Sequence, residues 1–201
     1  MKKTKVICVG EALIDRIKNK SNQKFTDFLG GAPANVSCAL KKLCIDSAFI
    51  GRLGRDEFGK KFTEKFKELE VNIEFLQLDN NLPTRIVKVN RNFYGDRYFS
   101  GFDVCSKTIF ADEELNCNLL KKDLKSLERL FLETKYFVTG TISLSSSMSA
   151  ESINFLINLT KKYDVRIIID LNWREVFWDY SNFSSEINQK ERILLIKNFL
   201  K

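Results

Sequence analysis

The chain has 201 residues, 44% of them hydrophobic, which suffices for a buried core in one large domain. It contains no histidine, which excludes Ser-His and Cys-His catalysis, histidine-ligated metals and a histidine general base. The net charge of +7 comes from lysines that alternate with acidic residues along helical segments, a pattern typical of a solvated helix face and not of a nucleic-acid-binding surface.

The cysteines and the N-terminus indicate a cytoplasmic protein. Five cysteines without metal-ligand spacing are typical of free thiols in a reducing compartment. No apolar run reaches membrane-spanning length, and the basic start, MKKTKVICVGEALID, is interpreted as a first buried strand and not as a signal peptide. We therefore expect neither a membrane nor a nucleic acid as a partner.

Short apolar runs alternate along the chain with amphipathic segments. The helix expected over residues 56–69 places Phe58, Phe62 and Phe66 on one face, with Asp56 as its N-cap. Such alternation predicts a parallel sheet covered by helices on both faces, a three-layer α/β/α fold. The expected strands are residues 6–10, 48–50, 136–139 and 166–170, and the expected helices are residues 34–43, 56–69, 112–133, 150–162 and 186–200.

One region interrupts this alternation. Residues 83–102, PTRIVKVNRNFYGDRYFSGF, are expected to form two short strands around a turn at residues 94–96. Because a hairpin between βα units cannot easily join a parallel core, we expect it to project as a lid. The polar segment over residues 17–29 is expected to accompany it.

The stretch FLGGAPANVSCALKKL places Gly30 and Gly31 directly before a helical pattern that includes Asn35. Glycines let the backbone approach a ligand closely, and a helix N-terminus favours an oxygen-rich or anionic partner. The alternative interpretation is an ordinary tight turn before a helix.

Polar residues follow several of the predicted strands. Glu11 and Asp15 follow the first strand, Gly140 and Thr141 follow a later one, and DLNWRE, residues 170–175, contains the end of the last. In open parallel α/β sheets, ligands bind beyond the carboxyl ends of the strands. Together these residues predict one cleft.

Five motifs in this order resemble the ribokinase-like (PfkB-type) sugar kinases, and most closely the fructokinases. They are VGEALID, GGAPANVS, FIGRLGRDEFGKKF, the hairpin TRIVKVNRNFYGDRYFSGF, and DLNWREVFW. The resemblance implies ATP-dependent phosphorylation of a sugar with Mg²⁺. It covers what would be the N-terminal two-thirds of such a kinase.

The resemblance also implies roles for individual residues. Those expected to bind the sugar are Asp15, Gly30, Gly31, Asn35, Arg97 and Thr141, and those expected to order phosphate and Mg²⁺-bound water are Asp170, Asn172, Arg174 and Glu175. Arg174 is expected either to offset phosphate charge or to help hold the sugar. Three of these roles have an alternative. Asp15 could be a solvated loop carboxylate, and Asn35 could be an ordinary residue of the first helical turn. Arg97 could merely pack within the lid or at a homodimer interface formed by the lid.

One departure from the family pattern bears on the fold, and another bears on activity. Cys44 stands where a small Gly or Ser usually ends the first helix, so we expect local strain there. The Gly-Ala-Gly-Asp helix start that supplies the family's catalytic Asp and anion-binding amides does not occur in residues 1–201. The resemblance implies that this segment, and with it the catalytic base, would lie beyond Lys201.

We therefore assign no catalytic base and expect that this chain alone does not phosphorylate sugar. Without the segment that would follow Lys201, we also expect exposed apolar surface at the sheet edge, around residues 166–170 and 186–200. The alternative is a non-catalytic sugar- or partner-binding remnant of a kinase.

Overall fold

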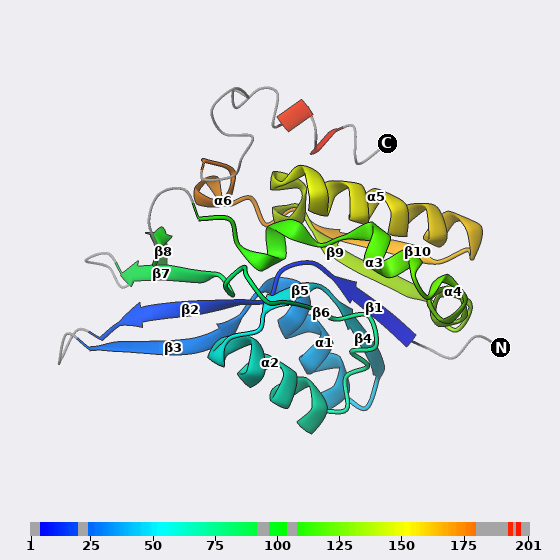
Figure 1. Ribbon diagram of the computed structural model, residues 1–201, viewed down its shortest axis with the longest axis horizontal. Coiled ribbons are helices and arrows are strands. Elements are labelled where there is room, and N and C mark those ends of the chain that lie inside the picture. The colour runs from blue at the N-terminus through cyan, green and yellow to red at the C-terminus, as the bar shows by residue number, and fades with distance from the viewer. Residues whose placement is uncertain are drawn as a thin grey trace.

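A computed structural model of the protein describes residues 5–19, 24–91, 97–103, 108–179, 193–194 and 196–197. A four-stranded parallel sheet in the order β10-β9-β1-β4 forms its centre (Figure 1). The strands are β1 (Lys5–Val9), β4 (Asp46–Ile50), β9 (Tyr136–Gly140) and β10 (Arg166–Asp170). The three-layer fold predicted from the alternation of strands and helices is confirmed.

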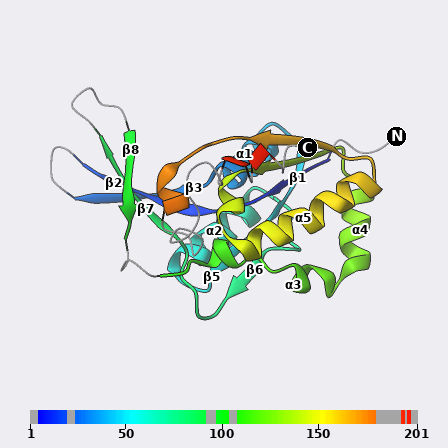
Figure 2. The ribbon, with the colours of Figure 1, turned by 90° about the horizontal axis from the view of Figure 1, so that it is seen from above.

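Alternate residues of β1 enter two separate cores, one on each face of the sheet. Val6 and Cys8 pack with the residues of α1 (Ala32–Lys42) and α2 (Glu57–Glu68). Ile7 and Val9 pack with α4 (Leu124–Leu132) and α5 (Ser147–Lys162) on the opposite face. Figures 1 and 2 show these helix pairs on either side of the sheet. A strand buried on both faces explains the unbroken apolar run that the sequence shows.

Helix α2 forms as its sequence predicts. The Asp56 side chain accepts a hydrogen bond from the Gly59 N–H and caps the helix. Phe62 and Phe66 are buried, and the Phe66 ring stacks on Phe49 of β4 with centroids 4.9 Å apart. Within the described part of the chain, none of the helices has both the length and the apolar character that a membrane span requires.

The single helix predicted over residues 112–133 is wrong. The segment is divided into η1 (Ala111–Glu114), α3 (Cys117–Lys121) and α4. The Asn116 side chain accepts hydrogen bonds from the N–H groups of residues 118 and 119, and Asp123 accepts one from the Ser126 N–H. Such local side-chain bonds start new helices and interrupt a continuous one.

Two antiparallel strands form within residues 83–102, as predicted, and they belong to a separate four-stranded sheet, which we call the lid sheet. This lid sheet has the order β3-β2-β7-β8 and lies at one end of the molecule (Figures 1 and 2). Its strands are β2 (Leu13–Lys18), β3 (Phe25–Gly30), β7 (Ile86–Arg91) and β8 (Arg97–Phe102). The turn expected at residues 94–96 lies outside the described residues.

Arg16 braces the lid sheet. Its guanidinium donates two hydrogen bonds of 2.7 Å to the Asp27 carboxylate and another to Asp103. The remaining short elements are β5 (Arg52–Gly54) and β6 (Gln77–Asp79), which pair with each other, η2 (Ile142–Ser145), and α6 (Glu175–Asp179).

Strand β10 lies at the edge of the central sheet, and no further strand pairs with it in the described ranges. Ile168 is 49% exposed and borders an apolar groove of about 430 Å³ against α1. The apolar exposure expected at this edge is therefore present. The helix predicted over residues 186–200 lies largely outside the described residues, and so does Lys201.

Three helices are followed by a non-glycine residue with a left-handed backbone. Cys44 has φ 59° after α1, Glu70 has φ 57° after α2, and Asp164 has φ 53° after α5. This conformation terminates a helix well but costs an L-residue roughly 1–2 kcal/mol. The strain expected at Cys44 therefore has a backbone origin.

We predict that Cys44→Gly raises the free energy of unfolding by about 0.5–1 kcal/mol, because relief of the left-handed strain exceeds the added freedom of the unfolded chain. Urea denaturation measures the change. The control is Lys42→Gly, which places glycine inside the last turn of α1 and should lower stability by about 1 kcal/mol. Equal losses in both variants would contradict the prediction.

Candidate functional site

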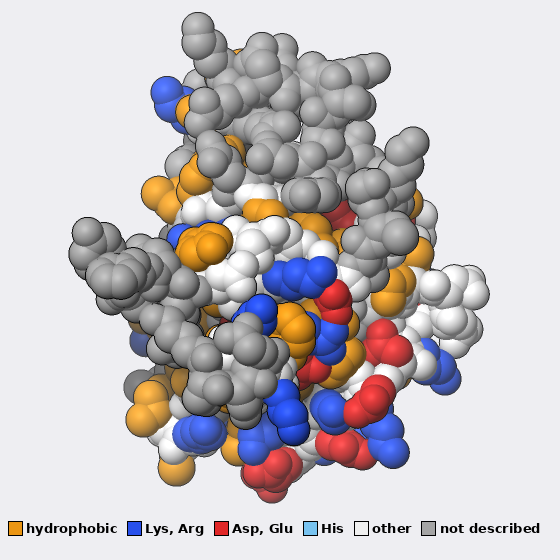
Figure 3. Space-filling view, turned by 90° about the vertical axis from the view of Figure 1, so that its left-hand side faces the viewer, with side chains coloured by type: hydrophobic (Ala, Val, Ile, Leu, Met, Phe, Trp, Pro, Cys, Tyr) orange, Lys and Arg blue, Asp and Glu red, His pale blue; other side chains and the backbone are white. Residues whose placement is uncertain are grey.

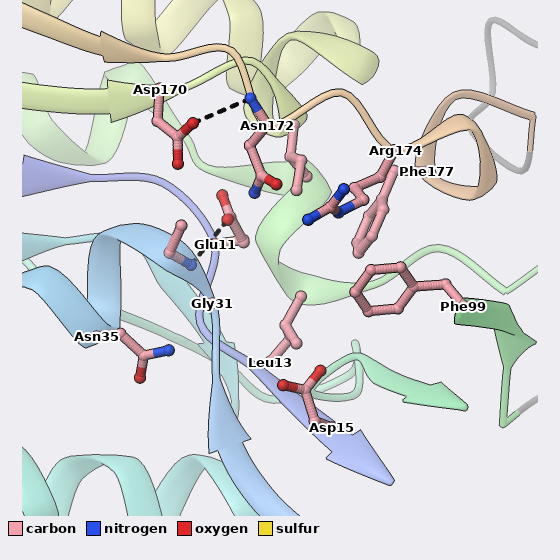
Figure 4. A pocket seen from close by; sticks show the side chains of 12 residues that line it. Glu11, Leu13, Asp15, Gly31, Asn35, Phe99, Asp170, Asn172, Arg174 and Phe177 are labelled. Atoms are coloured by element: carbon pink, nitrogen blue, oxygen red, sulfur yellow. Dashed lines mark hydrogen bonds between the residues drawn. The ribbon is translucent and has the colours of Figure 1, made fainter. Parts of the chain in front are cut away.

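A polar pocket of about 250 Å³ lies between the carboxyl ends of the central strands and the lid sheet (Figure 4). It is lined by Glu11, Leu13, Asp15, Gly31, Ala32, Asn35, Phe99, Ile142, Asp170, Asn172, Arg174 and Phe177. Six of the ten residues expected to bind substrate or to order phosphate and water are among these: Asp15, Gly31, Asn35, Asp170, Asn172 and Arg174.

Two glycines form the turn that brings α1 to the pocket. Gly31 has φ 96°, and a Cβ atom there would lie 2.4 Å from the backbone carbonyl oxygen of Glu11. Gly30 does not line the pocket, but a Cβ atom on it would lie 2.8 Å from the Asp15 carboxylate. The turn therefore requires glycine at Gly31, because there the chain passes directly over the segment that joins β1 to β2, whereas a side chain at Gly30 would displace the Asp15 carboxylate.

Asp15 and Asn35 reach the pocket from different elements. Asp15 is on β2, between Phe28 of β3 and Val87 of β7 in the sheet register. Asn35 is in the first turn of α1, and its backbone N–H donates to the Gly31 carbonyl at 2.9 Å. Figure 4 shows both side chains at the rim formed by the glycine turn and β2.

The loop after β10 supplies a second group of polar side chains. The Asn172 N–H donates to Asp170 Oδ1 at 3.0 Å, and Asn172 has a left-handed φ of 25°. The Arg174 guanidinium lies over the Phe99 ring of β8, 5.3 Å from its centroid. This contact joins the loop after β10 to the lid sheet.

Three other expected site residues, besides Gly30, are not placed in the pocket. Thr141 is buried, and its hydroxyl donates to the Leu171 carbonyl, so it supports the loop after β10 and does not face the cavity. Arg97 begins β8 and Glu175 begins α6, and both side chains lie outside the described part of the structure.

The catalytic base stays unassigned. The family resemblance implies a position beyond Lys201, which is the last residue of the sequence and itself lies outside the described residues. The structure therefore does not test that expectation.

Glu11 lines the pocket, as its place directly after the first strand predicted, although the family resemblance implied no role for it. Its side chain is 1% exposed, and its Oε1 accepts a hydrogen bond of 3.1 Å from the Ala32 N–H. Its Oε2 has no hydrogen-bond partner among the described residues. Burial raises the pKa of Glu11 from 4.5 to about 7. The sequence signal was an acidic residue directly after a buried strand.

The aromatic wall of the pocket was also missed. Phe99 and Phe177 meet edge to face with centroids 6.2 Å apart. Phe177 packs in the core and also faces the cavity. From sequence, an aromatic residue that borders a pocket cannot be distinguished from one that only fills a core.

A buried arginine lies behind this wall. Arg85 is 2% exposed and pairs with Asp112 at 3.0 Å and with Glu113 at 3.5 Å. Its guanidinium lies 4.8–5.0 Å from the ring centroids of Phe102, Phe110 and Phe177. The Arg85 cage, as we call these six residues, connects the lid strand β8, η1 and the pocket wall.

We predict that Glu11→Gln removes a pH-dependent loss of stability. Because the folded state holds the Glu11 proton more tightly than the unfolded state, stability should fall as the pH rises from about 4.5 through 7. The loss should reach about 3 kcal/mol above pH 8, and Glu11→Gln should avoid it. Thermal denaturation between about pH 5 and pH 8 tests this, with exposed Glu74→Gln as the control. Parallel curves for Glu11→Gln and wild type would refute it.

We also predict that Gly31→Ala destabilises the fold by roughly 2–4 kcal/mol, because both the left-handed φ and the Glu11 carbonyl oppose a Cβ atom. Gly140→Ala is the matched control, since its new Cβ would meet only the Asp170 carbonyl oxygen, at 3.6 Å. Chemical denaturation compares the two. A Gly31→Ala protein as stable as Gly140→Ala would show that the turn does not require glycine.

Comparison with known proteins places this fold and pocket in a family. The family model described as pfkB family carbohydrate kinase matches residues 3–189. Probable fructokinase-5 of Arabidopsis thaliana is 33% identical over 180 residues, which cover 86% of this chain and 52% of the relative. Fructokinase-2 of Oryza sativa subsp. japonica is 29% identical over 180 residues, which cover 86% and 50%.

Solved structures agree with the sequence relatives. A fructokinase from Xylella fastidiosa superimposes with a TM-score of 0.77 at 26% identity, covering 97% of this chain and 57% of that chain. The same protein with bound ATP gives a TM-score of 0.76 at 26% identity, covering 96% and 58%. The chain thus spans about half the length of the curated relatives it matches. It belongs to the pfkB family of carbohydrate kinases.

Proposed function

We propose that the pocket binds a sugar, fructose in the first place, as part of an ATP-dependent kinase that transfers the γ-phosphate of ATP to a sugar hydroxyl. The observation that carries this proposal is the convergence of Asp15, Asn35 and the Gly31 turn on one small polar cavity beside the lid strand β8. The curated relatives described above are fructokinases, which supports the choice of fructose.

The proposed sugar site uses complementary hydrogen-bonding groups. An ionised Asp15 only accepts hydrogen bonds and can take two hydroxyl donors, whereas the Asn35 amide both donates and accepts. Phe99 of the lid strand would cover the apolar carbon face of the sugar and help keep water out of the site. Gly30, Arg97 and Thr141 remain expectations from family resemblance, with Thr141 acting through the loop it supports.

The loop after β10 would face the phosphates. Asp170 is exposed, and one of its oxygens already accepts the Asn172 N–H, while Arg174 places a cation at the same mouth. Oxygen and amide groups of this kind fit the water shell of Mg²⁺, which prefers oxygen ligands and keeps several waters. Bound Mg²⁺ would neutralise phosphate charge, with Glu175 expected in the same outer shell. Arg174 would offset the remaining negative charge.

The chain spans about half the length of the fructokinase relatives it matches. We propose that residues 1–201 by themselves bind sugar without phosphorylating it. We assign neither the carboxylate that accepts the hydroxyl proton nor the helix N-terminus that stabilises the transferred phosphate, both of which are expected beyond Lys201. A general base contributes about 10²–10⁴ in rate, and one oxyanion-type donor contributes about 10²–10³. The alternative is a sugar- or partner-binding protein with no catalytic role, supported only by the lack of an assigned base.

Two further expectations belong to this proposal. Phe25, Phe28 and Tyr98 of the lid sheet are about half exposed, which supports a homodimer through the lid. Figure 3 views this end of the molecule and shows hydrophobic side chains at its surface. Four cysteines in the described ranges carry free thiols, which supports a reducing, cytoplasmic location.

We predict that the purified chain binds D-fructose by calorimetry and that Asp15→Asn weakens binding about tenfold or more, the effect of losing hydrogen bonds to a charged group. Phosphorylation of fructose with ATP and Mg²⁺ should stay near background, with the Xylella fastidiosa fructokinase as the positive control. Absence of fructose binding would overturn the assignment of the pocket. Turnover within about tenfold of the control would place the base in this chain, with Asp170 the first residue to replace.

A further inference from the structure

The segment between β1 and β2 directs alternate side chains into the pocket. Glu11, Leu13 and Asp15 all line it, while Ala12 and Ile14 pack into the core beneath α1. This period of two is that of an extended chain, whose successive side chains point to opposite faces. Figure 4 shows the Glu11 carboxyl group on the side of Leu13 that faces Asp170 and Asn172, and the Asp15 carboxyl group on the other side of Leu13. The pocket therefore presents a polar, apolar, polar stripe.

The burial of the Glu11 carboxyl group destabilises the folded protein when no ligand is bound. It is almost completely buried, and only Oε1 has a described partner, the Ala32 N–H at the start of α1. Oε2 is left without one in the ranges that the structure describes. A buried polar atom without a hydrogen bond loses its contact with water and gains nothing in exchange.

The neighbouring Arg85 cage differs from Glu11, because its buried charge has partners within the protein. Arg85 is also a buried charge, but two carboxylates and three aromatic rings surround it. Such a group is satisfied within the protein, whereas Glu11 Oε2 is not. An unpaired buried oxygen on a residue that borders a cavity is explained if a ligand completes its hydrogen bonding.

We propose that Glu11 is a second sugar-binding carboxyl group of the pocket, which takes a hydroxyl of the sugar with Oε2 while Oε1 holds the N-terminus of α1. This inference rests on the proposed sugar-binding function. It assigns two carboxyl groups to two different hydroxyls, one at each end of the stripe, with Leu13 between them against the carbon skeleton. The site would thereby select for a polyol with hydroxyls at that separation.

A carboxyl group suits this position in either protonation state. Ionised, Oε2 accepts a hydrogen bond from the hydroxyl, and protonated, it can donate to the hydroxyl oxygen. Burial raises the pKa of Glu11 to about 7, so both forms occur near neutral pH. The hydroxyl, being both donor and acceptor, can pair with either.

The decisive experiment is calorimetric titration of the full chain with D-fructose and with its monodeoxy analogues, each lacking one hydroxyl. Wild type, Glu11→Gln and Asp15→Asn are compared. Gln keeps an acceptor for the Ala32 N–H but replaces the carboxyl oxygen Oε2. In wild type, two analogues lacking different hydroxyls should each bind about tenfold or more weakly than fructose. Glu11→Gln should abolish one of these penalties, and Asp15→Asn should abolish the other.

Stability separates this role from a purely structural one. At about pH 8, Glu11→Gln should unfold less readily than wild type while binding fructose less tightly, an opposition expected of a functional residue. If Glu11 had only a structural role, Glu11→Gln would lower both the stability and the fructose affinity, or would leave the fructose affinity unchanged.

The outcomes distinguish this inference from the proposed function. Fructose binding by wild type with the same dependence on hydroxyls in Glu11→Gln would overturn the role of Glu11 alone. The role of Glu11 would also be overturned if Glu11→Gln and Asp15→Asn both abolished the affinity penalty for the same missing hydroxyl. No fructose binding by wild type would overturn the sugar site and the role of Glu11 with it.

Discussion

The close passage of the Gly30–Gly31 turn over the segment between β1 and β2 is the constraint on which the site depends. At Gly31 the two backbones approach so closely that even one methyl group would collide with the Glu11 carbonyl. This contact fixes the start of α1 against the end of β1, and therefore fixes Asn35 relative to Glu11 and Asp15. A looser turn would leave the same side chains present but several ångströms apart, and hydrogen-bonding sites do not tolerate such errors.

The site also depends on a segment of the chain that connects the two sheets. Residues 5–9 belong to the central sheet, and residues 13–18 belong to the lid sheet, so one short segment carries side chains from a rigid core to a projecting element. The central sheet provides the fixed reference because β1 is buried on both faces. The lid sheet has its own braces, chiefly Arg16, and can therefore hold Asp15 without joining the central sheet.

Most features that depend on neighbouring residues in the sequence could be predicted from it. The parallel strands, helix α2, the lid hairpin and the glycine turn follow from periodicity, capping and glycine placement. The division of residues 112–133 could not be predicted, because Asn116 and Asp123 interrupt the helical pattern with their own side-chain bonds. The burial of Glu11 and the inward position of Thr141 depend on neighbours distant in sequence. The same holds for the aromatic wall, in which Phe99 and Phe177 meet from the lid and α6.

The Arg85 cage has a mechanical consequence for the lid. Phe102 at the base of β8 and Phe177 in the pocket wall contact the same buried guanidinium, which two carboxylates also hold. Separating them would expose a charge and three rings, so the base of the lid is clamped to the main body. The hairpin has a register shift between Lys88 and Val89, farther along the strands. A bulge of this kind bends and twists a strand, so the hairpin changes direction between Phe102, which the cage holds at the base, and Phe99, which lies beyond the bulge.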